Sequence, residues 1–166
     1  MKKLVTIVFA ICIATVTFAQ TQKFAHINTS DLLILMPEVS QADQALQKYG
    51  KDLDSELMVM SQEYQKKLTD FQAKQVNMAE SIKQSKIKEI TDLEGRIRQF
   101  EQTAQQDIVA EREKLYQPIL TKVQKAIDDV AAEKKYAYVF DTSTGAVLVA
   151  STTDDIIDAV KTKLGI

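Results

Sequence analysis

The sequence is poor in the residues that interrupt or cross-link a chain. It contains two prolines, four glycines, one cysteine and no tryptophan among 166 residues. The cysteine is Cys12, so residues 20–166 can form no disulfide, no thiolate metal site and no thiol nucleophile. Because proline and glycine usually mark turns and helix ends, their scarcity predicts long, uninterrupted elements.

The motifs of common enzyme sites are also missing from the sequence. It contains no nucleophile elbow, no P-loop and no glycine-rich dinucleotide fingerprint. His26 is the only histidine, and without a cysteine or a second histidine it cannot complete a typical metal site. We interpret Asp128-Asp129 as a solvated helix face and Asp154-Asp155 as an acidic helix start. We therefore expect no enzymatic activity, no cofactor and no metal.

The chain has no excess of basic residues. Its 21 Lys and Arg residues face 23 Asp and Glu residues, which gives a formal net charge of −2. Without Lys2 and Lys3 the basic residues number 19, so the net charge of the remainder is −4. Such a surface offers no general attraction for phosphates, and we expect no nucleic-acid partner.

The N-terminus has the layout of a secretory signal peptide. Lys2 and Lys3 precede an uncharged apolar run, residues 4–18, and Thr17-Phe18-Ala19 places small residues before Gln20. We predict that residues 1–19 are removed by cleavage after Ala19. An uncleaved membrane anchor is a weaker interpretation because the run is shorter than the ~20 residues needed to span a bilayer. Lipidation at Cys12 is also weaker because no lipobox precedes it.

Residues 38–135 are predicted to form long helices. This stretch, between Pro37 and Tyr136, is rich in Gln, Lys, Glu, Ala and Leu. Its apolar positions recur every three or four residues in two stripes. The first stripe consists of Leu46, Tyr49, Leu53, Leu57, Met60, Tyr64, Leu68, Phe71, Gln75, Met78 and Ile82, and the second of Ile90, Leu93, Ile97, Phe100, Ala104, Ile108, Glu111, Leu115, Ile119, Val123, Ala126 and Val130.

Two apolar stripes on one chain favour an antiparallel helical hairpin, which we call the arm. The stripe step averages about 3.6 residues, so the two helices should lie side by side with little supercoiling. Helices of equal length would place the turn near residues 81–88 and make the arm roughly 70 Å long. The predicted seam includes Leu53, Leu57, Met60, Tyr64, Phe71, Met78, Ile97, Phe100, Ile108 and Leu115.

Three features of the arm bear on bending and binding. Pro118 removes a backbone donor inside the second helix and should kink it. Met58 lies off the stripe, and its flexible, apolar side chain makes it a candidate contact for a client protein. Lys83, Lys86 and Lys88 make the predicted tip locally basic, which suits solvation as well as contact with a client or a membrane surface.

Residues 20–37 and 136–166 are predicted to form a small β-body. Residues 23–28, 136–140 and 146–150 are short apolar segments, and the last two should form a β-hairpin through the turn at 141–145. Ser30 or Asp31 should cap a short helix, and a closing helix should begin near Thr152. Strands apolar on both faces need cover, which predicts self-association through a body that includes Phe24, Ile27, Tyr138, Val139, Phe140, Val147 and Val149.

Five segments, in order along the chain, resemble those of the Skp/OmpH family of periplasmic chaperones. Phe24-Ala25-His26-Ile27-Asn28 resembles the family's first strand, and Met36-Pro37-Glu38 resembles the start of its first arm helix. The family's returning helix resembles residues 115–119 with 125–127, its second strand resembles residues 133–141, and its terminal helix resembles residues 154–164. The resemblance spans nearly all of residues 20–166.

The resemblance implies an α+β homotrimer with long coiled-coil arms around a cavity. It implies a periplasmic chaperone that holds unfolded outer-membrane β-barrel proteins without ATP. Better-known members are strongly basic, whereas this chain is mildly acidic, so we infer no lipopolysaccharide site. The alternative is a structural coiled-coil protein of the envelope or an adaptor for one fixed partner.

Overall fold

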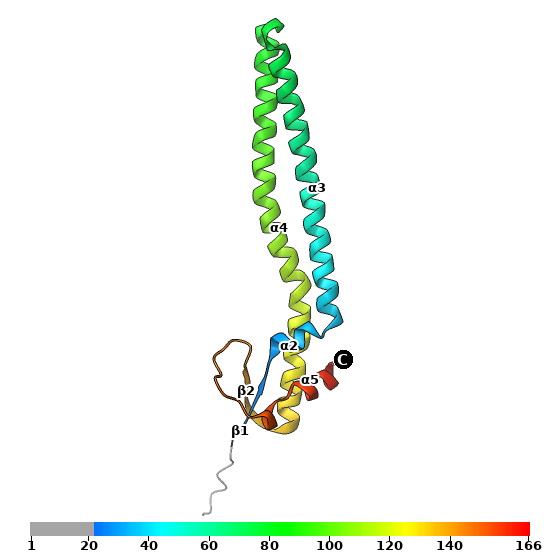
Figure 1. Ribbon diagram of the computed structural model, residues 1–166, viewed down its shortest axis with the longest axis vertical. Helices are drawn as coiled ribbons and strands as arrows, with labels where there is room; N and C mark the ends of the chain where they lie inside the picture. The colour runs from blue at the N-terminus through cyan, green and yellow to red at the C-terminus, as the bar shows by residue number, and fades with distance from the viewer. Residues whose placement is uncertain (1–21) are drawn as a thin grey trace, which may run out of the picture.

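The computed structural model describes residues 22–166, and the predicted signal peptide lies outside this range. Figure 1 shows a long pair of helices rising from a small body that holds the C-terminus. The predicted fold class, an α+β chain with a helical hairpin on a small β-containing body, is confirmed. Within residues 22–166, no helix is long and apolar enough to cross a membrane.

The arm consists of α3, residues Pro37–Lys74, and α4, residues Glu80–Lys134. At 1.5 Å per residue they are about 57 Å and 82 Å long. The two helices run antiparallel and pack along most of α3 (Figure 1). Pro37 occupies the first turn of α3, where its missing N–H costs no hydrogen bond.

The turn between the helices was predicted at residues 81–88, and this position is wrong. A short 3₁₀ turn, η1, covers Gln75–Asn77, and α4 already begins at Glu80. The prediction assumed helices of equal length, but α4 has 55 residues and α3 has 38. The extra turns of α4 continue past the start of α3 and enter the body. Residues 81–88 are polar because they form the exposed first turns of a helix.

The body packs around the C-terminal part of α4. Strands β1, Lys23–Ile27, and β2, Tyr136–Asp141, pair in parallel, with Phe24 opposite Tyr138 and His26 opposite Phe140. Helices α2, Thr29–Ile34, and α5, Ile157–Leu164, complete the body. The core contains Ala25, Ile27, Leu32, Met36, Ala42, Ile119, Val123, Ala126, Ile127, Val130, Ile156 and Val160.

The predicted β-hairpin between residues 136–140 and 146–150 is wrong. Residues 146–150 form no strand in this chain, and β2 pairs with β1 instead. The carboxylate of Asp141 accepts hydrogen bonds from the backbone N–H of Ser143 and from the Thr29 hydroxyl, at 2.9 and 2.6 Å. The backbone N–H of Thr142 donates to the carbonyl of Ile27. These bonds tie the turn to the end of β1 and direct the chain away from β2.

Two predicted helix starts are shifted by the local capping groups. The side chain of Asn28 caps α2 by accepting hydrogen bonds from the N–H groups of Ser30 and Asp31, so the cap precedes both predicted residues. Residues Thr152–Asp154 form a 3₁₀ turn, η2, and α5 begins only at Ile157. The Asp155 carboxylate accepts a hydrogen bond from the Ile157 N–H, consistent with the predicted acidic start.

Truncation of a core leucine should destabilise the body strongly. Leu32 is fully buried, so Leu32→Ala leaves a cavity and should lower the free energy of unfolding by about 2–5 kcal/mol. Leu120 on α4 is 44% exposed, so Leu120→Ala should change stability by less than about 1 kcal/mol. Urea unfolding of both variants measures the difference. Equal losses would contradict the placement of the core around Leu32.

Candidate functional site on the arm and body surfaces

The residues predicted at the seam between α3 and α4 differ in their burial. Met60 is buried and Ile108 is the most exposed, at 36%. The two helices are joined near the base by a hydrogen bond from the Tyr116 hydroxyl to Asp43 and by the Lys122–Glu38 ion pair. The remaining seam residues are partly buried, namely Leu53, Leu57, Tyr64, Phe71, Met78, Ile97, Phe100 and Leu115.

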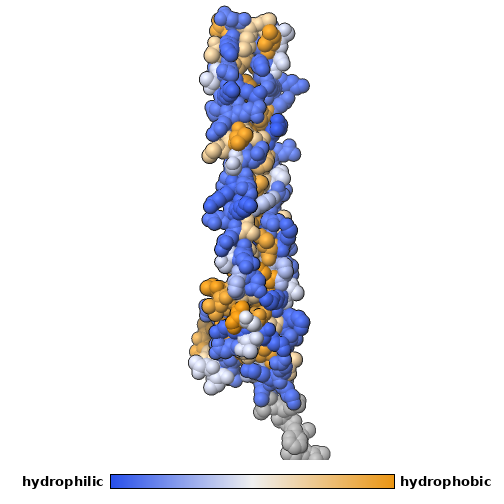
Figure 2. All heavy atoms as spheres, turned by 90° about the vertical axis from the view of Figure 1, so that its right-hand side faces the viewer, coloured by the Kyte–Doolittle hydropathy of each residue, from blue (hydrophilic) through white to orange (hydrophobic). Residues whose placement is uncertain are grey.

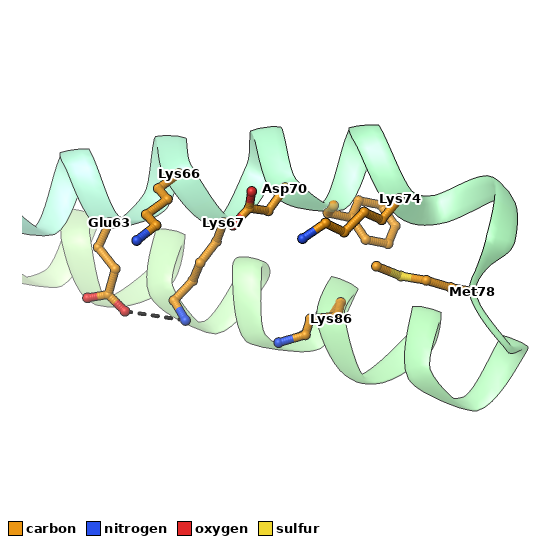
Figure 3. A pocket seen from close by; sticks show the side chains of 8 residues that line it. Glu63, Lys66, Lys67, Asp70, Lys74, Met78 and Lys86 are labelled. Atoms are coloured by element: carbon orange, nitrogen blue, oxygen red, sulfur yellow. Dashed lines mark ion pairs between the residues drawn. The ribbon is translucent and has the colours of Figure 1, made fainter.

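Near the turn, charged residues from both helices surround an opening between α3 and α4. Figure 3 shows Lys66, Lys67 and Lys74 on α3 and Lys86 on α4, with Met78 pointing back from the turn. Glu63, Asp70 and Phe71 complete the lining of this opening, which we call the tip pocket. Four lysines outnumber two carboxylates here, so the pocket is locally basic.

One carboxylate joins the two helices at the tip pocket. The Glu89 carboxylate on α4 accepts hydrogen bonds from Lys67 of α3 and, at 2.9 Å, from Lys86 of its own helix. The Lys67 Nζ atom also lies 3.5 Å from a carboxylate oxygen of Glu63. The hydrogen bonds from Lys67 and Lys86 lower the pKa of Glu89 to about 2. The hydrogen bond to Glu89 likewise raises the pKa of Lys67.

The predicted tip lysines fall on the first three turns of α4 and differ in their partners. The Lys83 Nζ atom lies 3.5 Å from a carboxylate oxygen of Glu80, and Lys86 forms an ion pair with Glu89. Lys88 lies in none of the ion pairs found among residues 22–166. Sequence reasoning missed Lys66, Lys67 and Lys74, because only the helix register brings these α3 residues beside Lys86.

Exposed apolar side chains occur along the arm and around the body. Figure 2 shows mainly hydrophilic side chains on the arm, with apolar patches between them. Met58 is 62% exposed, which leaves it accessible for the contact predicted from its position off the stripe. Val76 in the turn is 87% exposed. Neither side chain contributes to the buried core.

One face of the two-stranded sheet carries three aromatic rings in a row. Phe24 stacks on Tyr138 with ring centroids 5.8 Å apart, and Phe140 lies 6.2 Å from Phe24 and 6.5 Å from Tyr138. About half of each side chain remains exposed. We call this surface the aromatic face. Nothing else in residues 22–166 covers it fully.

The other residues predicted for a shared body lie in different surroundings. Ile27 is 1% exposed, so it packs inside its own chain and cannot contribute to an interface between copies. Side chains along β1 alternate between the two faces of the sheet, and Ile27 lies on the inward face. Val139 and Val147 are partly buried, whereas Val149 is 90% exposed.

Pro118 lies inside α4, which continues without interruption to Lys134. Figure 1 shows that α4 curves between the arm and the body. The missing N–H of proline leaves the carbonyl four residues earlier without its helical partner, which permits such curvature. Pro118 marks the level at which α4 passes from the seam with α3 into the body core, which begins at Ile119.

The polar residues considered for metal or acid–base chemistry have structural partners. Within residues 22–166, no group of three or more His, Cys, Asp or Glu side chains could hold a metal ion. The His26 ring Nε2 lies 2.8 Å from the carbonyl oxygen of Ser151 and ties that segment to β1. Asp128 accepts a hydrogen bond from Gln124, and Asp129 pairs with Lys125 on the same helix face.

Comparisons with known proteins agree with this architecture. Residues 23–164 match the model of a family described as outer membrane protein (OmpH-like). A solved structure from Caulobacter crescentus, described as a putative outer membrane chaperone (OmpH-like), superposes with a TM-score of 0.76. The alignment is 17% identical and covers 86% of this chain and 83% of that one. No curated protein matches the sequence significantly.

The charge cluster at the tip should respond to the loss of Lys67. Its hydrogen bond is the largest cause of the low pKa of Glu89, so Lys67→Gln should raise that pKa from about 2 toward the ordinary value of about 4.3. NMR titration of the Glu89 carboxyl measures this shift. Lys88→Gln, which removes a lysine outside the cluster, should leave it unchanged.

The same titration fixes the pH range of the contact. A carboxyl whose pKa is lowered in the folded chain stabilises the fold fully above its ordinary pKa of about 4.3, and this contribution is lost as the pH falls through about 2. A wild-type Glu89 that titrates near pH 4 would contradict the inter-helix contact.

Proposed function

This chain belongs to the OmpH-like family of outer membrane proteins, and from that premise we propose that it is an ATP-independent periplasmic holdase. In this role it binds unfolded outer-membrane β-barrel proteins in a cavity between the arms of a homotrimer. The observation that carries the proposal is the combination of a long two-helix arm with a body that leaves apolar surface uncovered.

The aromatic face supports assembly through the body. Three half-exposed rings stacked on a two-stranded sheet are costly to leave in water, and a small sheet of this kind seldom persists alone. Copies of the chain related by closed symmetry would bury the rings of every protomer at once. Self-association is therefore the simplest cover for Phe24, Tyr138 and Phe140.

The segment at residues 146–150 supports the same assembly. Its sequence, Ala-Val-Leu-Val-Ala, suits a strand, yet Leu148 and Val149 are 93% and 90% exposed. Strand β2 has β1 on one side, and no other strand of residues 22–166 pairs with its second edge. We propose that residues 146–150 pair with a sheet edge in a neighbouring copy, which would satisfy both features.

The arms are suited to holding a client loosely. Each arm is a single two-helix seam with many polar side chains, so it should bend at a modest energetic cost. Exposed Met58 and Val76 offer apolar contacts that tolerate different client sequences. The basic tip pocket offers contacts for acidic residues of a client. Many weak contacts of this kind retain an unfolded chain without a chemical energy source.

We propose periplasmic localisation, with the predicted signal peptide as the means of export and with clients as the principal partners. Nothing in residues 22–166 recommends a catalytic role, and we propose none. A structural envelope protein or an adaptor remains the alternative, and it predicts one fixed partner and no general protection of unfolded chains.

Loss of the aromatic face should dissociate the assembly. Tyr138→Ser/Phe140→Ser removes two of the three rings that the proposed interface buries. Light scattering should therefore report a trimer for the wild type and smaller species for the variant. Val76→Ser removes an exposed apolar side chain at the turn and should remain trimeric. A monomeric wild type would contradict the shared body.

Protection of a client tests the function itself. The wild-type trimer should keep an unfolded outer-membrane β-barrel protein soluble without ATP, and the dissociated variant should protect it much less, because the cavity between arms is lost. Turbidity after dilution of the client from urea measures this. A trimer that lets the client aggregate would favour the adaptor alternative.

A further inference from the structure

In the middle of the arm, the two helices leave a groove along their seam that is separate from the tip pocket. It is lined by side chains of both helices and has a volume of about 300 Å³. Ala104 lies between the larger side chains of Phe100 and Ile108, and its small size leaves room opposite α3. The groove is lined by Leu53, Asp54, Leu57, Phe100, Glu101, Ala104, Gln105 and Ile108. We call it the mid-arm groove.

The mid-arm groove combines an apolar floor with an acidic rim. Leu53, Leu57 and Phe100 are partly buried in the groove, whereas the carboxylates of Asp54 and Glu101, one from each helix, belong to exposed residues. Met58 lies one helical turn from Asp54 on the same face of α3 and is largely exposed. Val109, beside Ile108 on α4, is 66% exposed. Apolar contact surface therefore extends beyond the groove itself.

Between the flanking basic residues Lys51 and Lys66 on α3 and Arg98 and Arg112 on α4, every charged side chain is acidic. Residues 52–65 and 99–111 contain seven carboxylates and no lysine or arginine. Only two of the seven, Glu63 and Glu111, lie in ion pairs of the described chain, with Lys67 and Lys114. The five others are Asp52, Asp54, Glu56, Glu101 and Asp107. The lysine-rich tip pocket lies toward the turn, so positive and negative surfaces follow one another along the arm.

We propose that the mid-arm groove binds apolar side chains of an unfolded client where lysine or arginine flanks them. The groove would take one aromatic or branched side chain, and the rim carboxylates would pair with the neighbouring cations. Such a contact is complementary in both shape and charge, and each part alone is weak. This inference rests on the proposed function, because it names the client segments that the arm prefers.

Paired peptides test this preference. The full sequence is expressed so that the cell processes it, and the chain is purified from the periplasm. The probes are a short, serine-rich fluorescent peptide with phenylalanine flanked by lysines and its twin with glutamates in place of the lysines. Fluorescence anisotropy at low salt should show about fivefold tighter binding of the lysine peptide, and higher salt should reduce the difference.

Matched variants locate the preference. Asp54→Asn/Glu101→Gln should remove most of the discrimination between the two peptides. Asp92→Asn/Asp128→Asn changes the net charge equally at exposed positions away from the groove and should retain it. The amide oxygen placed at position 128 can still accept the hydrogen bond from Gln124. Ala104→Leu fills the groove and should weaken binding of both peptides.

Client protection separates a failure of this inference from a failure of the proposed function. Equal binding of the two peptides, or discrimination unchanged by Asp54→Asn/Glu101→Gln, overturns the groove proposal even if the wild type still protects a β-barrel client. A wild type that protects no client overturns the holdase function, whatever the peptides show. If Asp92→Asn/Asp128→Asn reduced the discrimination between the peptides as much as Asp54→Asn/Glu101→Gln does, a local site would also be refuted.

Discussion

The packing of the last turns of α4 is the contact on which the rest of the structure depends. Ile119, Val123, Ala126, Ile127 and Val130 fill the centre of the body core, while the same helix forms one side of the arm. Buried residues of β1, α2 and α5 belong to the same core as this segment. Because one rigid element belongs to both parts, the direction of the arm is coupled to the packing of the body.

The arm itself is held together differently. Beyond the level of Pro118 it has only the seam between two helices, where Met60, Ile90 and Leu93 are the buried apolar side chains. Ion pairs at the tip and the base supplement this narrow seam, but exposed pairs contribute little each. The stable body and the adaptable arm therefore follow from the amount of apolar surface that each part can bury.

The sequence predicted the hairpin because helical periodicity is a local signal. The turn at Gln75–Asn77 was missed because the signal does not show how far α4 runs past α3. Residues 146–150 were predicted as a strand from their composition, yet pairing depends on a partner that the chain itself does not supply. The contact between Lys67 and Glu89 and the mid-arm groove depend on the register of the two helices, which no local pattern contains. The small Ala104 among larger seam residues was the only hint of the groove.

The parallel pairing of β1 with β2 has a consequence for how the chain acquires its structure. The whole arm separates the two strands in sequence, so their pairing is a contact of very long range. Contacts of this kind form slowly, because closing a long flexible loop costs entropy before any long-range contact can stabilise the chain. Helix formation and zipping of the hairpin from its turn would shorten that loop step by step and carry the two ends together. The arm would then serve as a folding template for the body.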